Sequence, residues 1–136
     1  MQETRDGAES ETRDAPPRRI LLVEDNRDLR EALGAVLEDA GYDVAFAPNG
    51  KAALDLLRKG VAPAVILLDL AMPVMSGWAF RRHQADDPAL ATIPVIVLSA
   101  DPRAAGLADS PGIRDVLAKP VDIEVLQRAL ERVWSR

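Results

Sequence analysis

The chain has 136 residues, a formal net charge of −5 and no cysteine, so it holds one ordinary domain without disulfides, thiolate zinc sites or a cysteine nucleophile. His83 is the single histidine, which excludes a multi-histidine metal site, and the acidic balance argues against nucleic acid as the main ligand. No apolar run approaches the roughly 18 residues of a membrane span, and the first residues do not read as a signal peptide, so we expect no membrane contact and a cytoplasmic location.

The first 18 residues are polar and predict a disordered N-terminal tail. They contain five acidic residues and three arginines but almost no apolar side chain. Such a segment buries too little apolar surface to offset the entropy lost on ordering. Pro16 and Pro17 close it. We therefore expect a tail over residues 1–18 and a folded domain over residues 19–136.

Beyond the tail, short apolar runs alternate with helical patterns. Wholly apolar runs are typical of strands that are buried on both faces of a parallel sheet. The predicted strands are residues 20–23, 42–46, 64–68, 93–98 and 113–118. Helices are predicted after each strand, up to residue 40, from 49 to near 60, over 78–85, weakly over 104–108, and over 123–133. Five such units predict an α/β fold, namely a flavodoxin-like doubly wound parallel sheet with strand order 2-1-3-4-5 and helices on both faces.

Polar side chains follow four of the five predicted strands. The first strand ends in Glu24 and Asp25, the third in Asp69, the fourth in Ser99 and the fifth in Lys119. In an open α/β sheet the ligand crevice lies outside the carboxyl ends of the strands, beside the first strand. Strand order 2-1-3-4-5 therefore predicts that these five side chains gather at one site.

Each of these five residues also has a purely structural interpretation. Glu24 or Asp25 can cap a helix, Asp69 can open a turn, Ser99 can cap the following helix, and Lys119 can be an ordinary surface lysine. Their joint placement favours a functional site, because all of them lie at the same end of neighbouring strands. The chain also has only three lysines, so the placement of one of them at this end of the sheet is less easily explained by chance.

The chemistry of this set points to phosphoryl transfer. Crowded carboxylates repel one another and are stabilised by a hard divalent cation. Mg²⁺ takes one or two protein carboxylates, which Asp25 and Asp69 can provide. A carboxylate beside Mg²⁺, an ammonium group and a hydroxyl can receive a phosphoryl group as an aspartyl phosphate. The sequence has no glycine-rich loop for ATP, so the donor of the phosphoryl group must be another molecule.

Four segments of the sequence resemble the receiver domain of two-component response regulators: ILLVEDN, LLDLAMPVMSGW, PVIVLSA and VLAKP. The resemblance implies that Asp69 is the phosphoacceptor, with a histidine kinase or a histidine phosphotransfer protein as the donor. It also implies a Mg²⁺ site that is formed by Glu24, Asp25, Asp69 and the backbone carbonyl of Ala71.

The same resemblance assigns roles to residues after the later strands. Ser99 occupies the Ser/Thr switch position, whose hydroxyl moves inward on phosphorylation, and Lys119 is the lysine that stabilises the phosphoryl group. A cis peptide bond is expected between Lys119 and Pro120. Pro73 and Gly77 match the loop that follows the acceptor. In this family phosphorylation reshapes the face formed by the fourth helix, the fifth strand and the fifth helix.

Two positions depart from the pattern of the family. Glu24 stands where aspartate is more common, and its extra methylene suggests that it reaches the metal through water or orients Asp25, whereas Asp25 coordinates directly. Val116, three residues before Lys119, stands at the aromatic switch position. A rotating tyrosine or phenylalanine ring therefore cannot report phosphorylation in the usual way.

The sequence thus predicts a single-domain response regulator in a phosphorelay. Mg²⁺-dependent phosphoryl transfer from a kinase phosphohistidine to Asp69 would switch contacts with an unidentified target protein. A homodimer is one option for the oligomeric state of the chain. The chain is expected to be a switch that catalyses its own phosphorylation and dephosphorylation rather than an enzyme. The alternatives are a fragment of a larger regulator, a degenerate receiver that only binds partners, and a haloacid dehalogenase-type phosphatase. Such a phosphatase needs a second aspartate where this chain has Ala71.

Overall fold

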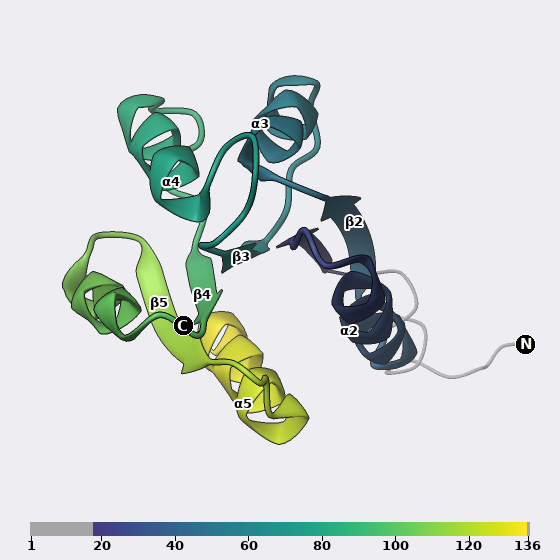
Figure 1. Ribbon diagram of the computed structural model, residues 1–136. Coiled ribbons are helices and arrows are strands. Elements are labelled where there is room, and N and C mark those ends of the chain that lie inside the picture. Colours follow the sequence, from purple (N-terminus) through teal and green to yellow (C-terminus); the bar gives the residue numbers. More distant parts are fainter. Residues whose placement is uncertain (1–17, 136) are drawn as a thin grey trace, which may run out of the picture.

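Five short apolar segments form one parallel sheet in residues 18–135, the part of the chain that the computed structural model describes (Figure 1). The strands are β1 (Arg19–Val23), β2 (Asp43–Ala47), β3 (Val65–Asp69), β4 (Val95–Ser99) and β5 (Ile113–Ala118). They pair in the order β2-β1-β3-β4-β5, and every pair is parallel. The predicted α/β fold and strand order are confirmed; the bounds of β5 are as predicted, and those of the other strands are shifted by one or two residues.

Helices cover both faces of the sheet. They are α2 (Arg27–Asp39), α3 (Gly50–Arg58), α4 (Gly77–Asp86), α5 (Ile123–Trp134) and the 3₁₀ helix η1 (Pro102–Asp109). In Figure 1, α2 and α5 lie on one face of the sheet, whereas α3, α4 and η1, the green coil beside β5, lie on the other. In the described part of the chain, none of these helices has the length and apolar character needed to cross a membrane.

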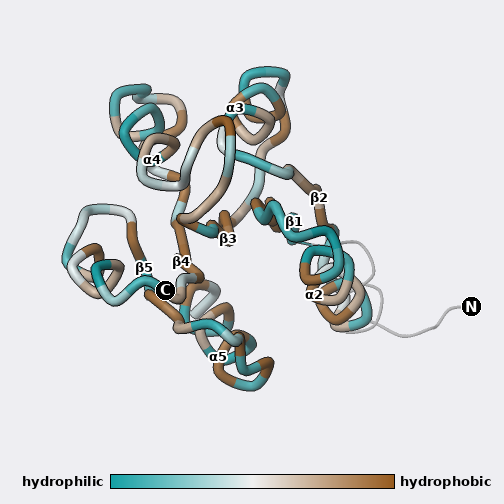
Figure 2. The backbone as a smooth tube through the Cα atoms, in the orientation of Figure 1, coloured by the Kyte–Doolittle hydropathy of each residue, from teal (hydrophilic) through white to brown (hydrophobic). Residues whose placement is uncertain are grey.

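The alternation of side chains along each strand divides the core into two layers. Ile20 and Leu22 pack toward α2 and α5, whereas Leu21 and Val23 pack toward α3, α4 and η1. All residues of the central strands β3 and β4 are buried, and these strands carry the apolar colour in the middle of Figure 2. Burial on both faces explains why the first four residues of each of these strands are apolar. The last residues, Asp69 and Ser99, are the exceptions, and both lie at the carboxyl edge of the sheet.

One predicted helix and one alternative interpretation differ from the structure. The α-helix predicted over residues 104–108 is a 3₁₀ helix over residues 102–109, in which only Ala104 is buried. Pro102 begins this segment and its apolar content is low, so it packs as a short connector rather than as an amphipathic α-helix. The cap of α2 is Asn26, whose side chain accepts from the Leu29 amide, and neither Glu24 nor Asp25 takes that role.

The predicted N-terminal tail falls almost entirely on residues 1–17, which lie outside the described residues. The predicted domain boundary near residue 19 coincides with the first residue of β1. The division of the chain into a tail and a folded domain stays a prediction.

Candidate functional site

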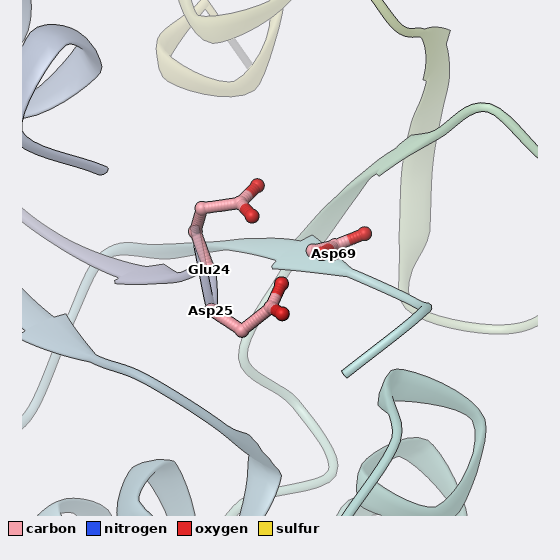
Figure 3. Close-up of side chains that lie close together, drawn as sticks. All are labelled: Glu24, Asp25 and Asp69. Atoms are coloured by element: carbon pink, nitrogen blue, oxygen red, sulfur yellow. The ribbon is translucent and has the colours of Figure 1, made fainter. Parts of the chain in front are cut away.

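The carboxyl ends of β1 and β3 bring three carboxylates together (Figure 3). Glu24 and Asp25 directly follow β1, and Asp69 is the last residue of β3. One carboxylate oxygen from each residue lies within 4.8 Å of the others. Glu24 and Asp69 are buried, whereas Asp25 is exposed to solvent. The sheet therefore assembles the acidic cluster that the sequence predicts, because β1 and β3 are neighbours although 41 residues separate Val23 from Val65 in the chain.

Glu24 has 0 % of its surface exposed, and both of its carboxylate oxygens are engaged. Oε1 accepts from Lys119 Nζ at 2.8 Å, and Oε2 accepts from the Asn26 amide at 3.0 Å. Arg30 donates to the Glu24 carbonyl oxygen at 2.8 Å, a contact that no sequence motif indicates. A buried carboxylate with these partners is held in one place, and its charge is balanced by Lys119.

Asp69 is 4 % exposed and lies beside the same ammonium group. Its Oδ1 accepts from the Ala71 amide at 3.3 Å and lies 3.4 Å from Lys119 Nζ. Burial and the negative charge of Glu24 raise the pKa of Asp69 from 3.8 to about 6, against the opposing effects of Lys119 and the Ala71 amide. Near neutral pH Asp69 is therefore a carboxylate, but one whose charge is poorly compensated.

Lys119 connects the two buried acids. Burial acts to lower the pKa of its ammonium group, but the hydrogen bond that it donates to Glu24 and the charge of Asp69 outweigh this effect and raise the pKa above its usual value. Lys119 therefore stays protonated, and its side chain is only 20 % exposed. Its amide donates to the Ser99 carbonyl oxygen at 3.0 Å, and the predicted cis peptide bond to Pro120 is present.

Ser99 lies at the end of β4 and is 7 % exposed. Its Oγ accepts from the Asp101 amide at 2.9 Å. Within residues 18–135, no hydrogen bond joins this hydroxyl to Glu24, Asp25 or Asp69. The structure thus places Ser99 at the predicted edge of the sheet, with its oxygen bonded to the segment that begins η1.

The loop between β3 and α4 passes close to the acceptor carboxylate. Gly77 donates its amide to the Leu70 carbonyl oxygen at 2.9 Å, and a Cβ atom at this position would clash with the Asp69 carbonyl oxygen. Only glycine fits this close approach. The Pro73 carbonyl oxygen accepts from the Met75 amide at 2.7 Å, which tightens the loop, and Ala71 is exposed at its start.

Val116 lies half-buried on β5 and packs against the core layer shared with α3, α4 and η1.

Comparison with known proteins identifies the family. The profile of the response regulator receiver domain matches residues 20–131. The chain belongs to this family of phosphoacceptor switches in two-component signalling. The match assigns the chain to receivers rather than to the haloacid dehalogenase-type phosphatases.

Particular relatives illustrate the settings in which this fold occurs. PilH of Pseudomonas aeruginosa is 34 % identical over 119 residues, which cover 86 % of this chain and 98 % of PilH. A signal receiver domain of a histidine kinase from Syntrophus aciditrophicus is 36 % identical with a TM-score of 0.77, covering 87 % of this chain and 90 % of that one. The response regulator TrrA of Thermotoga maritima, solved in complex with Mg²⁺ and BeF, is 25 % identical with a TM-score of 0.75, covering 85 % and 98 %.

Proposed function

We propose that the chain is a single-domain response regulator in which Asp69 accepts a phosphoryl group from a phosphohistidine. The observation that carries this proposal is the environment of Asp69. This carboxylate lies at the end of a central strand, 3.4 Å from a half-buried ammonium group, and its oxygen lies within 4.8 Å of those of two further acids. Membership of the receiver family agrees with a phosphoacceptor role.

The transfer would proceed by attack of an Asp69 carboxylate oxygen on the phosphorus atom of the phosphohistidine. The new O–P bond forms as the N–P bond breaks, and the bonding pair returns to the imidazole nitrogen of the donor. Oδ1 is held by the Ala71 amide and Lys119, whereas no hydrogen bond from residues 18–135 reaches Oδ2. We therefore assign the attack to Oδ2, the oxygen with the more available lone pairs.

A divalent cation fits the acidic cluster, because all of its donors are carboxylate oxygens, which suit Mg²⁺. Asp25 and Asp69 would bind the metal directly, together with the backbone carbonyl of Ala71. Glu24 would act from the outer shell, since its two oxygens are already bonded to Lys119 and to the Asn26 amide. Bound Mg²⁺ would supply positive charge that stabilises the phosphoryl oxygens in the transition state. The related TrrA has been solved with Mg²⁺, which supports this assignment.

Lys119 and Ser99 would hold the transferred phosphoryl group. Lys119 already lies beside the acceptor carboxylate, 3.4 Å from its Oδ1, and is held there by Glu24, so little reorganisation is needed for it to bind a phosphoryl oxygen. The Ser99 hydroxyl lies at the end of the next strand, since Asp69 pairs with Leu98 in the β3–β4 register. A phosphoryl group adds three acceptor oxygens near this hydroxyl, which can donate to one of them.

We further propose a cytoplasmic protein whose partners are a histidine kinase or a histidine phosphotransfer protein and a downstream target. Support for a kinase partner comes from the related receiver domain within a histidine kinase. PilH, which this chain covers over 98 % of its length, supports a receiver that works without an attached output domain.

The proposal is tested by incubating the protein with Mg²⁺ and acetyl phosphate and measuring its intact mass. We expect one added phosphoryl group that is removed by base and is absent in Asp69→Asn. Asp55→Asn, an exposed aspartate paired with Lys51 on α3, is the matched control and should be labelled like the wild type. Equal labelling of Asp69→Asn would disprove the acceptor assignment. If neither acetyl phosphate nor a phosphorylated kinase labels the wild type, the chain is instead a degenerate receiver that acts as a binding adaptor.

A further inference from the structure

The backbone carbonyl of Glu24 receives its hydrogen bond from an arginine side chain. Arg30, on α2, donates to this oxygen from Nη1 at 2.8 Å. Glu24 is fully buried, and within residues 18–135 no backbone amide donates to the same oxygen. A buried carbonyl that lacks a partner is costly. The Arg30 contact therefore holds the peptide group between Glu24 and Asp25 in one orientation.

The backbone on either side of this peptide group is held as well. The Glu24 amide donates to the Ala47 carbonyl oxygen at 3.0 Å, and the Asn26 amide donates to the Glu24 carboxylate at 3.0 Å. The Asn26 side chain in turn accepts from the Leu29 amide and caps α2. These contacts fix the chain before and after the peptide group, whereas Arg30 supplies the contact to the peptide group itself.

Asp25 depends on this backbone more than the other two acids of the cluster do. The carboxylates of Glu24 and Asp69 both contact Lys119. Asp25 is exposed, and in the described part of the chain no hydrogen bond or ion pair reaches its carboxylate. Its side chain leaves the backbone in a different direction from that of Glu24 (Figure 3). The orientation of the preceding peptide group therefore decides where the Asp25 carboxylate can lie.

We propose that Arg30 is a positioning residue of the metal site, because its bond to the Glu24 carbonyl directs Asp25 toward the cation. The inference rests on the proposed function, since it needs Asp25 as a direct Mg²⁺ ligand. Without the Arg30 donor, the peptide group would rotate until its carbonyl reached water, and Asp25 would move away from the other two acids. Groups that orient a metal ligand in this way contribute about tenfold to a hundredfold in affinity.

The charge of Arg30 acts in the opposite direction from its hydrogen bond. A guanidinium group so close to the acidic cluster repels a divalent cation, so the loss of its charge alone would tighten Mg²⁺ binding. The loss of its hydrogen bond would instead weaken Mg²⁺ binding. The sign of the change in affinity therefore separates positioning from electrostatics.

The test is Arg30→Met, which keeps an unbranched apolar stem but removes both the donor and the charge. Calorimetric titration with Mg²⁺ should show an affinity about tenfold below that of the wild type. The matched control is Arg27→Met, which removes an exposed arginine of the same helix that pairs with Glu31. This control should bind Mg²⁺ as tightly as the wild type or slightly more tightly. Unchanged or tighter binding by Arg30→Met would overturn the inference.

A conservative variant and a stability measurement guard against a simple loss of structure. Urea denaturation without Mg²⁺ shows whether each variant is folded. Arg30→Lys keeps the charge and a donor but loses the planar guanidinium group, so its Mg²⁺ affinity should lie between those of the wild type and Arg30→Met. Electrostatics alone would leave Arg30→Lys like the wild type and make Arg30→Met bind more tightly, which would overturn the inference.

The Mg²⁺ dependence of phosphorylation separates binding from chemistry. In Arg30→Met, the Mg²⁺ concentration for half-maximal labelling by acetyl phosphate should rise about tenfold. The rate at saturating Mg²⁺ should stay at the wild-type level, because the contact of Arg30 is to the backbone of Glu24 rather than to Asp69 or Lys119. A lower saturated rate with an unchanged half-saturating concentration would overturn the inference.

The wild type distinguishes the two levels of the argument. A wild type that neither binds Mg²⁺ nor is labelled would overturn the proposed function and this inference with it. A wild type that binds Mg²⁺ and is labelled, beside an Arg30→Met variant of equal Mg²⁺ affinity, would overturn this inference alone.

Discussion

The two ends of the parallel sheet are built in opposite ways. At the carboxyl end, two buried acids share one ammonium group, from Lys119, and the exposed Asp25 adds a further negative charge. At the amino end, Trp134 on α5 donates its Nε1 hydrogen to the Tyr42 hydroxyl at 2.9 Å. The two rings lie 5.9 Å apart, and the Arg18 guanidinium lies 4.7 Å from the Trp134 ring. The amino end is thus closed by packing and a satisfied hydrogen bond.

This difference separates chemistry from stability within one small fold. The carboxyl end leaves negative charge in excess of positive charge, which prepares it for a cation and a phosphoryl group but works against folding. At the amino end the charges are compensated, because Arg19 pairs with Asp43 at 2.6 Å and the Arg18 guanidinium lies against the Trp134 ring, so this end contributes stabilising contacts. Substitutions at the carboxyl end should therefore affect phosphorylation, whereas substitutions at the amino end should affect only the free energy of unfolding.

The largest effect is expected for Lys119→Ala. Removing the ammonium group takes away charge stabilisation at the reacting oxygens, so the rate of labelling by acetyl phosphate should fall by about 100-fold or more. Glu24 is then left buried without its partner, and the free energy of unfolding should fall by about 3 kcal/mol. Urea denaturation in parallel with the labelling assay shows whether the variant is folded. The control is Lys51→Ala, at an exposed ion pair on α3, which should leave both the labelling rate and the free energy of unfolding unchanged. A labelling rate of Lys119→Ala close to that of wild type would contradict the role of Lys119 in stabilising the phosphoryl group.

The next largest effect is expected at the metal site. Because Asp25 is exposed and Glu24 is buried, the two acids should contribute unequally to Mg²⁺ binding. Asp25→Asn removes an exposed, direct ligand and should weaken Mg²⁺ binding by about 100-fold. Glu24→Gln keeps the shape of a side chain already bonded within the protein and should weaken it by about tenfold, as expected of an outer-shell group. Calorimetric titration with Mg²⁺ measures both affinities. Equal losses in the two variants would refute the division between direct and outer-shell ligands.

A moderate effect of opposite sign is expected for the stability of Asp69→Asn. Because the pKa of Asp69 is raised from 3.8 to about 6 in the folded protein, the folded state binds the proton more tightly, and stability is lost as the pH rises through this range. The neutral amide avoids that loss, so the variant should be more stable than the wild type by about 1 to 3 kcal/mol at pH 7. Below pH 4 the difference should vanish.

Urea denaturation at the two pH values, without Mg²⁺, measures this effect. Asp55→Asn serves as the control, because its carboxylate is exposed and pairs with Lys51 on α3. A variant that is no more stable than wild type at pH 7 would mean that the negative charge of Asp69 does not work against folding.

The sheet could be predicted because its central strands are apolar along their whole length, and the site because each polar residue directly follows such a strand. The partners within the site could not be predicted. Glu24 and Lys119 are 95 residues apart, and their 2.8 Å contact depends on the register of the strands that carry them. The nature of η1 could not be predicted either, since a segment with so little apolar content shows no clear helical period and its hydrogen-bond pattern is set only when it packs. Local pattern therefore predicts which residues meet, and tertiary packing decides how they bond.

The smallest effect is expected at the amino end. Trp134→Phe removes the hydrogen bond to Tyr42 but keeps a ring in place, so the free energy of unfolding should fall by about 1 kcal/mol. Labelling by acetyl phosphate should stay at the wild-type level, because the change lies at the opposite end of the sheet. Tyr42→Phe removes the same bond from the other side, and the double variant should be destabilised by less than the sum of the two single variants. Additive losses would show that the two rings act separately, whereas a loss of labelling would show that the two ends of the sheet are coupled.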